Sequence, residues 1–125
     1  MKKKNRLPLI SVIIPTFNRA ELLRLSLGSL TRQTLPKKDF EVIVVDDGST
    51  DQTRQVCREM EKTLPLRYVF QANSGISTAK NLGVFMAQAP ILFFFDDDDV
   101  ADRNLLKEHL RSHREHPGEN VAILG

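Results

Sequence analysis

Four consecutive aspartates, Asp96–Asp99, follow the most apolar stretch of the chain, "ILFFF" at residues 91–95. Carboxylates about 6 Å apart repel each other by roughly 3 kcal/mol at an effective dielectric constant near 20, so such a run needs a reason. Hard divalent cations such as Mg²⁺ and Mn²⁺ prefer carboxylate oxygens, commonly together with substrate phosphates. Because successive side chains at a strand end point in opposite directions, we expect Asp96 and Asp98 on one side and Asp97 on the other, so that one side can hold a metal while the other hydrogen-bonds a ligand. The alternative is a solvated acidic turn.

Two further polar stretches carry candidate binding groups. In "VVDDGSTD" (44–51), two aspartates end an apolar run before a glycine turn. Either a carboxylate there accepts a hydrogen bond from a nucleobase N–H or a sugar hydroxyl, or the corner only caps a helix, with Ser49 and Gln52 as a capping box. In "NSGISTAKN" (73–81), helix N-terminal amides and Lys80 are suited to phosphate oxygens. The alternative is a solvated lysine on a surface helix, and the P-loop pattern is absent.

The segments that must position these groups alternate between two kinds. Short apolar runs, typical of buried strands, occupy residues 9–14, 41–45, 66–70, 91–95 and 121–124. Segments with helical spacing of apolar residues lie between them, at 20–30, 56–64, 79–86 and 106–110. This alternation predicts an α/β fold, with a doubly wound, mainly parallel sheet built from right-handed βαβ units. Ligands bind beyond the carboxyl ends of such strands, where "PTFNR", "DDGSTD" and "DDDD" all emerge.

Length and composition limit the class of protein. The chain has 125 residues, 41% apolar and 27% charged, which fits a single soluble globular domain over residues 1–125. A net charge of +2 gives no reason to expect nucleic-acid or membrane binding. The lone Cys57 fits a reducing compartment. The basic start before an apolar stretch has the outline of a signal peptide, but Pro8 and Ser11 interrupt it, so we predict a cytoplasmic protein.

With these residues in view, the chain resembles the family 2 glycosyltransferases, which have the GT-A fold. The stretches "SVIIPTFNR", "VIVVDDGSTDQT", "NSGISTAKNLG" and "FFFDDDD" occur in the family's order and approximate spacing, and together they extend over nearly the whole chain. The resemblance implies transfer of a sugar from a nucleotide-diphosphate sugar, most typically a UDP-sugar, to an acceptor that the sequence does not identify. It also implies a divalent metal cofactor, Mn²⁺ or Mg²⁺.

The resemblance further implies roles for particular residues. The residues assigned to the nucleotide are Pro15, Thr16, Asp47, Lys80 and Asp97, and those assigned to the metal are Asp96 and Asp98. Asp47 is expected to bind the base, typically the imide N–H of uracil, and Asp97 to face the ribose or the donor sugar. Asp98, in the family's D-x-D motif, is expected to ligate the metal that bridges the diphosphate. Lys80 stands where the family more often has Arg, so it offers a point charge without a bidentate contact.

The family's domain continues well beyond Gly125, and its later part carries the catalytic base and the acceptor site. The acids that follow the aspartate run match no base motif of the family; they are Asp102, Glu108, Glu115 and Glu119. We therefore expect a donor-binding half with no catalytic residue in this chain, and the base beyond Gly125. Because a later strand normally lies beside residues 91–95, we also expect an exposed sheet edge that favours homo-oligomers.

Two alternatives to a glycosyltransferase remain at this point. The stretch "FFFDDDDV" also fits the D-x-D-x-[TV] pattern of haloacid dehalogenase-type phosphatases, with Asp96 as nucleophile and Asp98 as acid. That motif belongs on the first strand of its domain, whereas here it lies near the end of the chain. The other alternative is a non-catalytic nucleotide-binding fragment, which would use the same binding residues.

Overall fold

The computed structural model describes residues 7–115 and 123–124, and its elements alternate as the sequence predicts. In chain order they are β1 (Ile10–Thr16), α1 (Ala20–Leu30), the 3₁₀ turn η1 (Lys37–Asp39), β2 (Phe40–Asp46), α2 (Thr53–Met60), β3 (Leu66–Phe70), α3 (Ile76–Met86), β4 (Ile91–Phe94), α4 (Leu105–Glu115) and β5 (Ile123–Leu124). Within the described ranges, no helix has the length and apolar character needed to cross a membrane.

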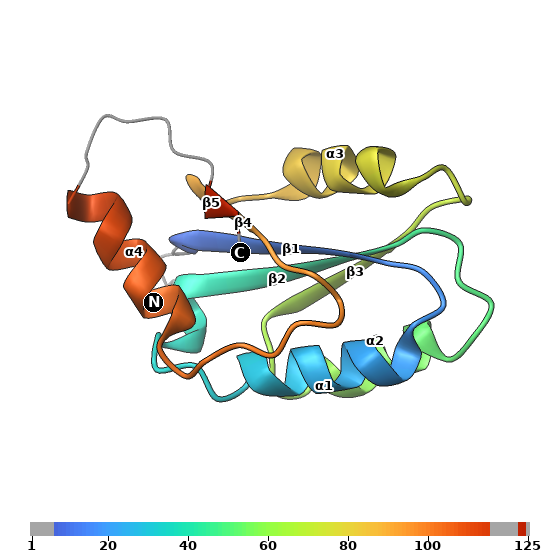
Figure 1. Cartoon of the computed structure of the whole chain (residues 1–125), viewed down its shortest axis with the longest axis horizontal. Coiled ribbons are helices and arrows are strands. Elements are labelled where there is room, and N and C mark those ends of the chain that lie inside the picture. Colours follow the sequence, from blue (N-terminus) through green and yellow to red (C-terminus); the bar gives the residue numbers. More distant parts are fainter. Residues whose placement is uncertain (1–6, 116–122, 125) are drawn as a thin grey trace, which may run out of the picture.

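The strands form one sheet in the order β3-β2-β1-β4-β5, and every neighbouring pair is parallel. Figure 1 shows α3 on one face of the sheet and α1, α2 and α4 on the other. From β1 the chain moves outward to β2 and β3, and it then crosses back through α3 to β4 on the other side of β1. The strand order therefore reverses between β1 and β4, which is the switch point at which doubly wound folds bind ligands. The predicted doubly wound α/β fold is confirmed.

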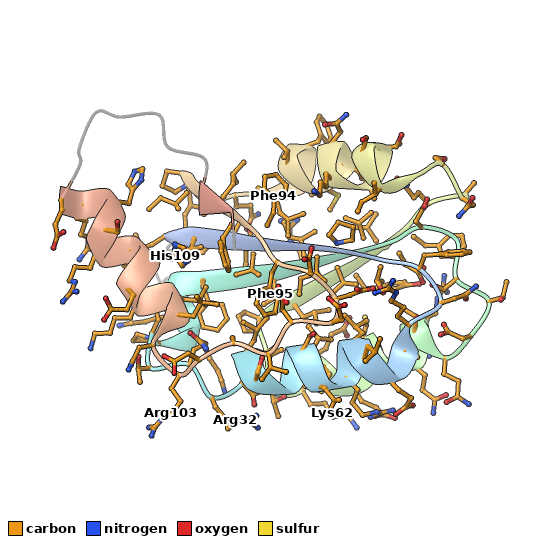
Figure 2. All side chains as sticks on the ribbon, viewed as in Figure 1. Arg32, Lys62, Phe94, Phe95, Arg103 and His109 are labelled. Carbon is orange, nitrogen blue, oxygen red and sulfur yellow. The ribbon has the colours of Figure 1, made fainter. Side chains whose placement is uncertain are left out.

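The two faces of the sheet are covered unequally. The larger core lies under α1, α2 and α4, and it includes Phe93 and Phe95. A smaller cluster lies under α3, where a Cβ added to Gly83 would come within 2.4 Å of Ile13 Cγ2. Figure 2 shows Phe94 on the α3 side of β4, with Phe95 on the opposite side. Burial on both faces explains why the central strands are apolar almost without interruption.

A buried polar network closes the amino-terminal end of the sheet. Glu41, on β2, accepts hydrogen bonds from Ser11 Oγ (2.6 Å), Arg67 Nη2 (2.9 Å) and the Gln88 backbone N–H (2.7 Å). The Ala89 N–H in turn donates to Ser11 Oγ (3.1 Å). One carboxylate thus ties β1, β2 and β3 to the connection between α3 and β4. Because the network lies at the end away from the carboxyl ends of the strands, its role is structural.

The sheet continues past β4, contrary to one expectation. Phe93 pairs with Ile123 and Phe94 with Leu124, in parallel register. The prediction that residues 91–95 keep an unpaired edge is therefore wrong at these two positions, because β5 takes the place that a later strand was expected to fill. The unpaired edge therefore no longer supports homo-oligomerisation at these positions, and homo-oligomerisation stays a prediction.

Candidate nucleotide and metal site

A cleft of about 350 Å³ opens at the carboxyl ends of β1 and β4, at the switch point of the sheet. Its lining residues are Pro15, Thr16, Phe17, Arg19, Asp47, Ile76, Ala79, Asp96, Asp97 and Asp98. Six of the seven residues that the sequence assigns to the nucleotide or the metal are among them. The exception is Lys80, whose Nζ lies 5.6 Å from the centroid of the Phe94 ring.

The aspartate run forms a tight turn. The Asp99 N–H donates to the carbonyl of Asp96 (3.2 Å), and Asp96, Asp98 and Asp99 each bring a carboxylate oxygen within 4.8 Å of the others. Asp96 and Asp98 are exposed, and Asp99 is half-buried. Three closely spaced carboxylates are a suitable donor set for a hard divalent cation, so the residues present fit Mg²⁺ or Mn²⁺. Asp99 was not singled out by the sequence, which pointed only to the alternating pair.

Asp97 also lines the cleft, but unlike Asp96 and Asp98 it is buried. Its Oδ2 accepts a hydrogen bond from Thr16 Oγ1 (2.9 Å), and its Oδ1 lies 3.4 Å from Arg19 Nη1. Burial raises the pKa of Asp97, and the negative charges of Asp98 and Asp96 add to that effect, whereas Thr16 and Arg19 oppose it. Asp97 is thus buried while Asp96 and Asp98 are exposed, but the backbone here is a turn, and Asp99 joins Asp96 and Asp98 rather than Asp97 as strand alternation would require.

Arg19 is a cleft residue that the sequence did not single out. Its Nη1 lies 3.4 Å from Asp97 Oδ1 and 3.5 Å from Asp98 Oδ2, so one guanidinium contacts two of the four aspartates. "PTFNR" was predicted to emerge at this edge, but the direction of the arginine side chain is set by the folded loop. A fixed positive charge here lowers the repulsion within the acidic turn.

The loops after β1 and β2 hold each other in place. Asn18, whose φ is +52°, accepts the Thr50 N–H at its Oδ1 (2.8 Å), and the Asn18 N–H donates to Ser49 Oγ (2.8 Å). Ser49 does not form the predicted capping box, because α2 begins only at Thr53. Its hydroxyl instead joins two loops that border the cleft.

The two adjacent aspartates after β2 have different surroundings. Asp46 is buried, and it accepts hydrogen bonds from the Ser49 N–H (2.8 Å) and from Tyr68 Oη (2.5 Å). Burial, followed by the hydrogen bond to Asp46, raises the pKa of Tyr68 to about 12. Asp46 is thus a structural acid, and only the second aspartate of the pair, Asp47, lines the cleft.

Asp47 holds the loop that leads into α3. Its Oδ1 accepts hydrogen bonds from the Ser74 N–H (2.7 Å) and Gln71 Nε2 (2.8 Å), while its Oδ2 accepts from the Gly75 N–H (3.0 Å) and Asn73 Nδ2 (3.4 Å). The Ser74 amide, followed by Gln71, lowers the pKa of Asp47. The carboxylate therefore stays ionised and fixes the wall of the cleft opposite the acidic turn.

Comparisons with known proteins agree with this geometry. Residues 11–123 match the family described as Glycosyl transferase family 2. The chain is 47% identical over 123 residues to validoxylamine A glucosyltransferase of Streptomyces hygroscopicus subsp. jinggangensis, a match that covers 97% of this chain and 29% of that protein. The chain therefore belongs to glycosyltransferase family 2.

Solved structures are similar in the same region. Staphylococcus aureus TarS 1–349 in complex with UDP-GlcNAc has a TM-score of 0.83 at 32% identity, over 92% of this chain and 37% of that one. The mannosyltransferase PcManGT of Pyrobaculum calidifontis, in complex with GDP-Man and Mn²⁺, has a TM-score of 0.69 at 33% identity, over 74% of this chain and 28% of that one. The arrangement of strands and helices is that of the GT-A fold.

These findings remove one of the alternatives. The aspartates follow the fourth strand of the chain, whereas a haloacid dehalogenase-type motif belongs on the first. The family match extends over most of the chain, including that motif. A phosphatase of that type is therefore excluded.

Proposed function

We propose that this chain binds the donor of a glycosyltransferase reaction, with a UDP-sugar as donor and Mn²⁺ or Mg²⁺ as cofactor. The observation that carries the proposal is the cleft at the switch point, lined by Asp47, Asp96, Asp97 and Asp98. The nucleotide sugars bound to TarS and to PcManGT, the latter with Mn²⁺, support this choice of ligand. The acceptor remains unassigned.

In this proposal the nucleoside lies along the end of β1. Pro15 and Thr16 contact it, and Phe17 and Ile76, which are both exposed at the cleft, provide apolar surface for a flat base. Asp47 accepts a hydrogen bond from the imide N–H of uracil, which replaces the long contact from Asn73 Nδ2 (3.4 Å). Since Asp47 already accepts bonds from the loop before α3, its orientation is set before the base arrives.

The sugar and diphosphate occupy the other side of the cleft. Asp97, held by Thr16, accepts a hydrogen bond from a hydroxyl of the ribose or of the donor sugar. Asp96 and Asp98, joined by Asp99, hold the cation. A cation bound there would supply Lewis acidity to neutralise charge on the diphosphate. Lys80 is kept as a phosphate contact, which requires its ammonium to rotate away from the Phe94 ring.

Calorimetric titration of UDP into the chain tests the proposal. We expect tighter binding with Mn²⁺ or Mg²⁺ than with a chelator. The Asp98→Ala variant should lose most of this metal dependence, whereas Asp47→Ala should bind UDP more weakly under both conditions. Glu108→Ala is the matched control, because it removes an exposed carboxylate on α4, away from the cleft.

The outcomes separate the parts of the proposal. Equal UDP affinity with metal and with chelator, unchanged by Asp98→Ala, contradicts the metal assignment. A preference for GDP over UDP leaves the cleft in place and changes only the base. No binding of either nucleotide contradicts the proposed function as a whole.

A further inference from the structure

The acidic turn rests on α1 through its main chain. Figure 1 shows the segment between β4 and α4, drawn in orange, running beside α1. At the centre of this contact is Ser26, which is fully buried, with its Oγ 2.8 Å from the carbonyl oxygen of Asp97 and 2.5 Å from that of Asp99. Two carbonyls of the turn thus converge on one hydroxyl, although its single hydrogen can be donated to only one of them at a time.

The same side of α1 continues the contact. Ser29, one helical turn further on, accepts the Ala101 N–H at its Oγ (2.8 Å) and donates to the Ser26 carbonyl (2.6 Å). Beyond the helix end, Gln33 Nε2 donates to the Asp102 carbonyl (2.6 Å). All of these bonds to the segment use its backbone groups. None of these bonds therefore uses the carboxylate of Asp96, Asp98 or Asp99.

We propose that Ser26 is a positioning residue for the metal, an inference that rests on the proposed function. Three carboxylates whose oxygens lie within 4.8 Å of one another repel, and this repulsion favours an opened turn whenever no cation is bound. Ser26 opposes that opening because its hydroxyl donates to the carbonyl of either Asp97 or Asp99 and so holds the turn against α1. A site whose ligands are already gathered loses less conformational entropy on binding and therefore has a higher affinity.

The test compares metal affinity with metal-free nucleotide affinity. Mn²⁺ is titrated into the 125-residue chain without nucleotide, and the free ion is followed by electron paramagnetic resonance. We expect Ser26→Ala to raise the Mn²⁺ dissociation constant roughly threefold to tenfold, as the loss of one hydrogen bond does. The affinity for UDP in the presence of chelator should fall by less than the Mn²⁺ affinity does, because Asp47 and the end of β1 hold the nucleoside independently of Ser26, and only Asp97 is shared.

Two further variants serve as controls, with folding checked by circular dichroism. Ser26→Cys keeps a weak donor in a slightly larger side chain, so its Mn²⁺ affinity should lie between those of wild type and Ser26→Ala, and it replaces the alanine variant if that one does not fold. Thr31→Ala removes a hydroxyl that donates to the Gly28 carbonyl within α1 (2.6 Å), and it should leave Mn²⁺ affinity unchanged.

Three results overturn the inference. An unchanged Mn²⁺ dissociation constant in Ser26→Ala excludes a positioning role. Equal weakening of Mn²⁺ and metal-free UDP binding shows a general structural role instead. If the wild-type chain binds no Mn²⁺, even with UDP, both the metal assignment of the proposed function and this inference are refuted. That result needs no variant, so it is distinguished from a failure of the Ser26 inference alone.

Discussion

Replacing Asp47 by Asn should destabilise the fold as well as weaken nucleotide binding. The carboxylate accepts two backbone N–H groups, from Ser74 and Gly75, and an amide from Gln71. An asparagine keeps one acceptor oxygen and turns a donor toward the other N–H groups. Hydrogen bonds to a charged acceptor contribute about 1.5–3 kcal/mol each, but the exposed loop donors regain water, so we expect a net loss of about 2–3 kcal/mol at pH 7.

The loss at Asp47 should depend on pH in a defined direction. Because its loop partners lower the pKa of Asp47, the native state binds the proton more weakly than the unfolded chain does. The stabilisation is fully present above the unfolded pKa of about 3.9 and is lost as pH falls through the lower folded value. The difference between wild type and Asp47→Asn should therefore be large at pH 7 and shrink below about pH 4.

Urea unfolding followed by circular dichroism at pH 7 and at pH 3 measures this effect. Glu108→Gln is the control, because it neutralises an exposed carboxylate on α4 that is paired with Arg111, and it should change stability little at either pH. The reasoning is refuted if Asp47→Asn is as stable as wild type at pH 7. It is also refuted if the difference at pH 7 persists unchanged at pH 3.

Three further substitutions test other parts of the molecule. Glu41→Ala should lower the free energy of unfolding by about 2–4 kcal/mol, since it leaves buried partners unpaired. The affinity for UDP should stay unchanged, and a fall in UDP affinity at constant stability would contradict the structural role of Glu41. Gly83→Ala should lower the free energy of unfolding by about 1–3 kcal/mol, measured in urea, because the new Cβ meets Ile13. An unchanged free energy of unfolding would show that α3 can shift. Lys80→Ala should weaken binding of UDP but not of uridine in calorimetry. If wild type and Lys80→Ala bind UDP with equal affinity, Lys80 does not contact the phosphates.

The alternation of strands and helices was predictable because its signal is local. Apolar runs bounded by turn residues gave the strands, and helical spacing gave the helices, so the predicted segments agree with the structure to within a few residues at most ends. The meeting of three polar stretches at one edge then followed from parallel topology alone. Strand alternation separated Asp97 from Asp96 and Asp98, but it would also have placed Asp99 with Asp97, whereas the turn at residues 96–99 gathers Asp99 with the other two.

What the sequence could not supply were contacts between distant segments. The guanidinium of Arg19 reaches Asp97, 78 residues away, and Ser26 reaches Asp99, 73 residues away. No local pattern encodes the direction of these side chains. Gly48 illustrates the same limit: a turn was predictable, but only the fold shows that a Cβ there would come within 2.9 Å of the Asn73 nitrogen at a φ of +90°. This close approach brings the loop before α3 to Asp47.

The acids near the cleft bear on whether this chain can transfer a sugar. The cleft-lining residues that the structure describes include four acids, and the proposed function assigns each of them to the donor or the metal: Asp47, Asp96, Asp97 and Asp98. Further along the chain, Asp102 accepts the Asn104 N–H (3.0 Å), and Glu108 pairs with Arg111 (2.9 Å) on α4. Glu115 lies 3.9 Å from the same arginine, and Glu119 falls outside the described residues.

An inverting transfer needs a base within about 3 Å of the acceptor hydroxyl, and carboxylates bound to a cation or to fixed donors are poor proton acceptors. Loss of a general base forfeits ~10²–10⁴ in rate, and loss of acceptor positioning forfeits roughly 7–11 kcal/mol more. We therefore expect the 125-residue chain to bind nucleotide sugars and to hydrolyse them slowly at most. Incubation with a panel of nucleotide sugars and acceptors, followed by mass spectrometry, checks this. Acceptor glycosylation at ordinary enzymatic turnover would contradict it and would place the base among the acids of this chain.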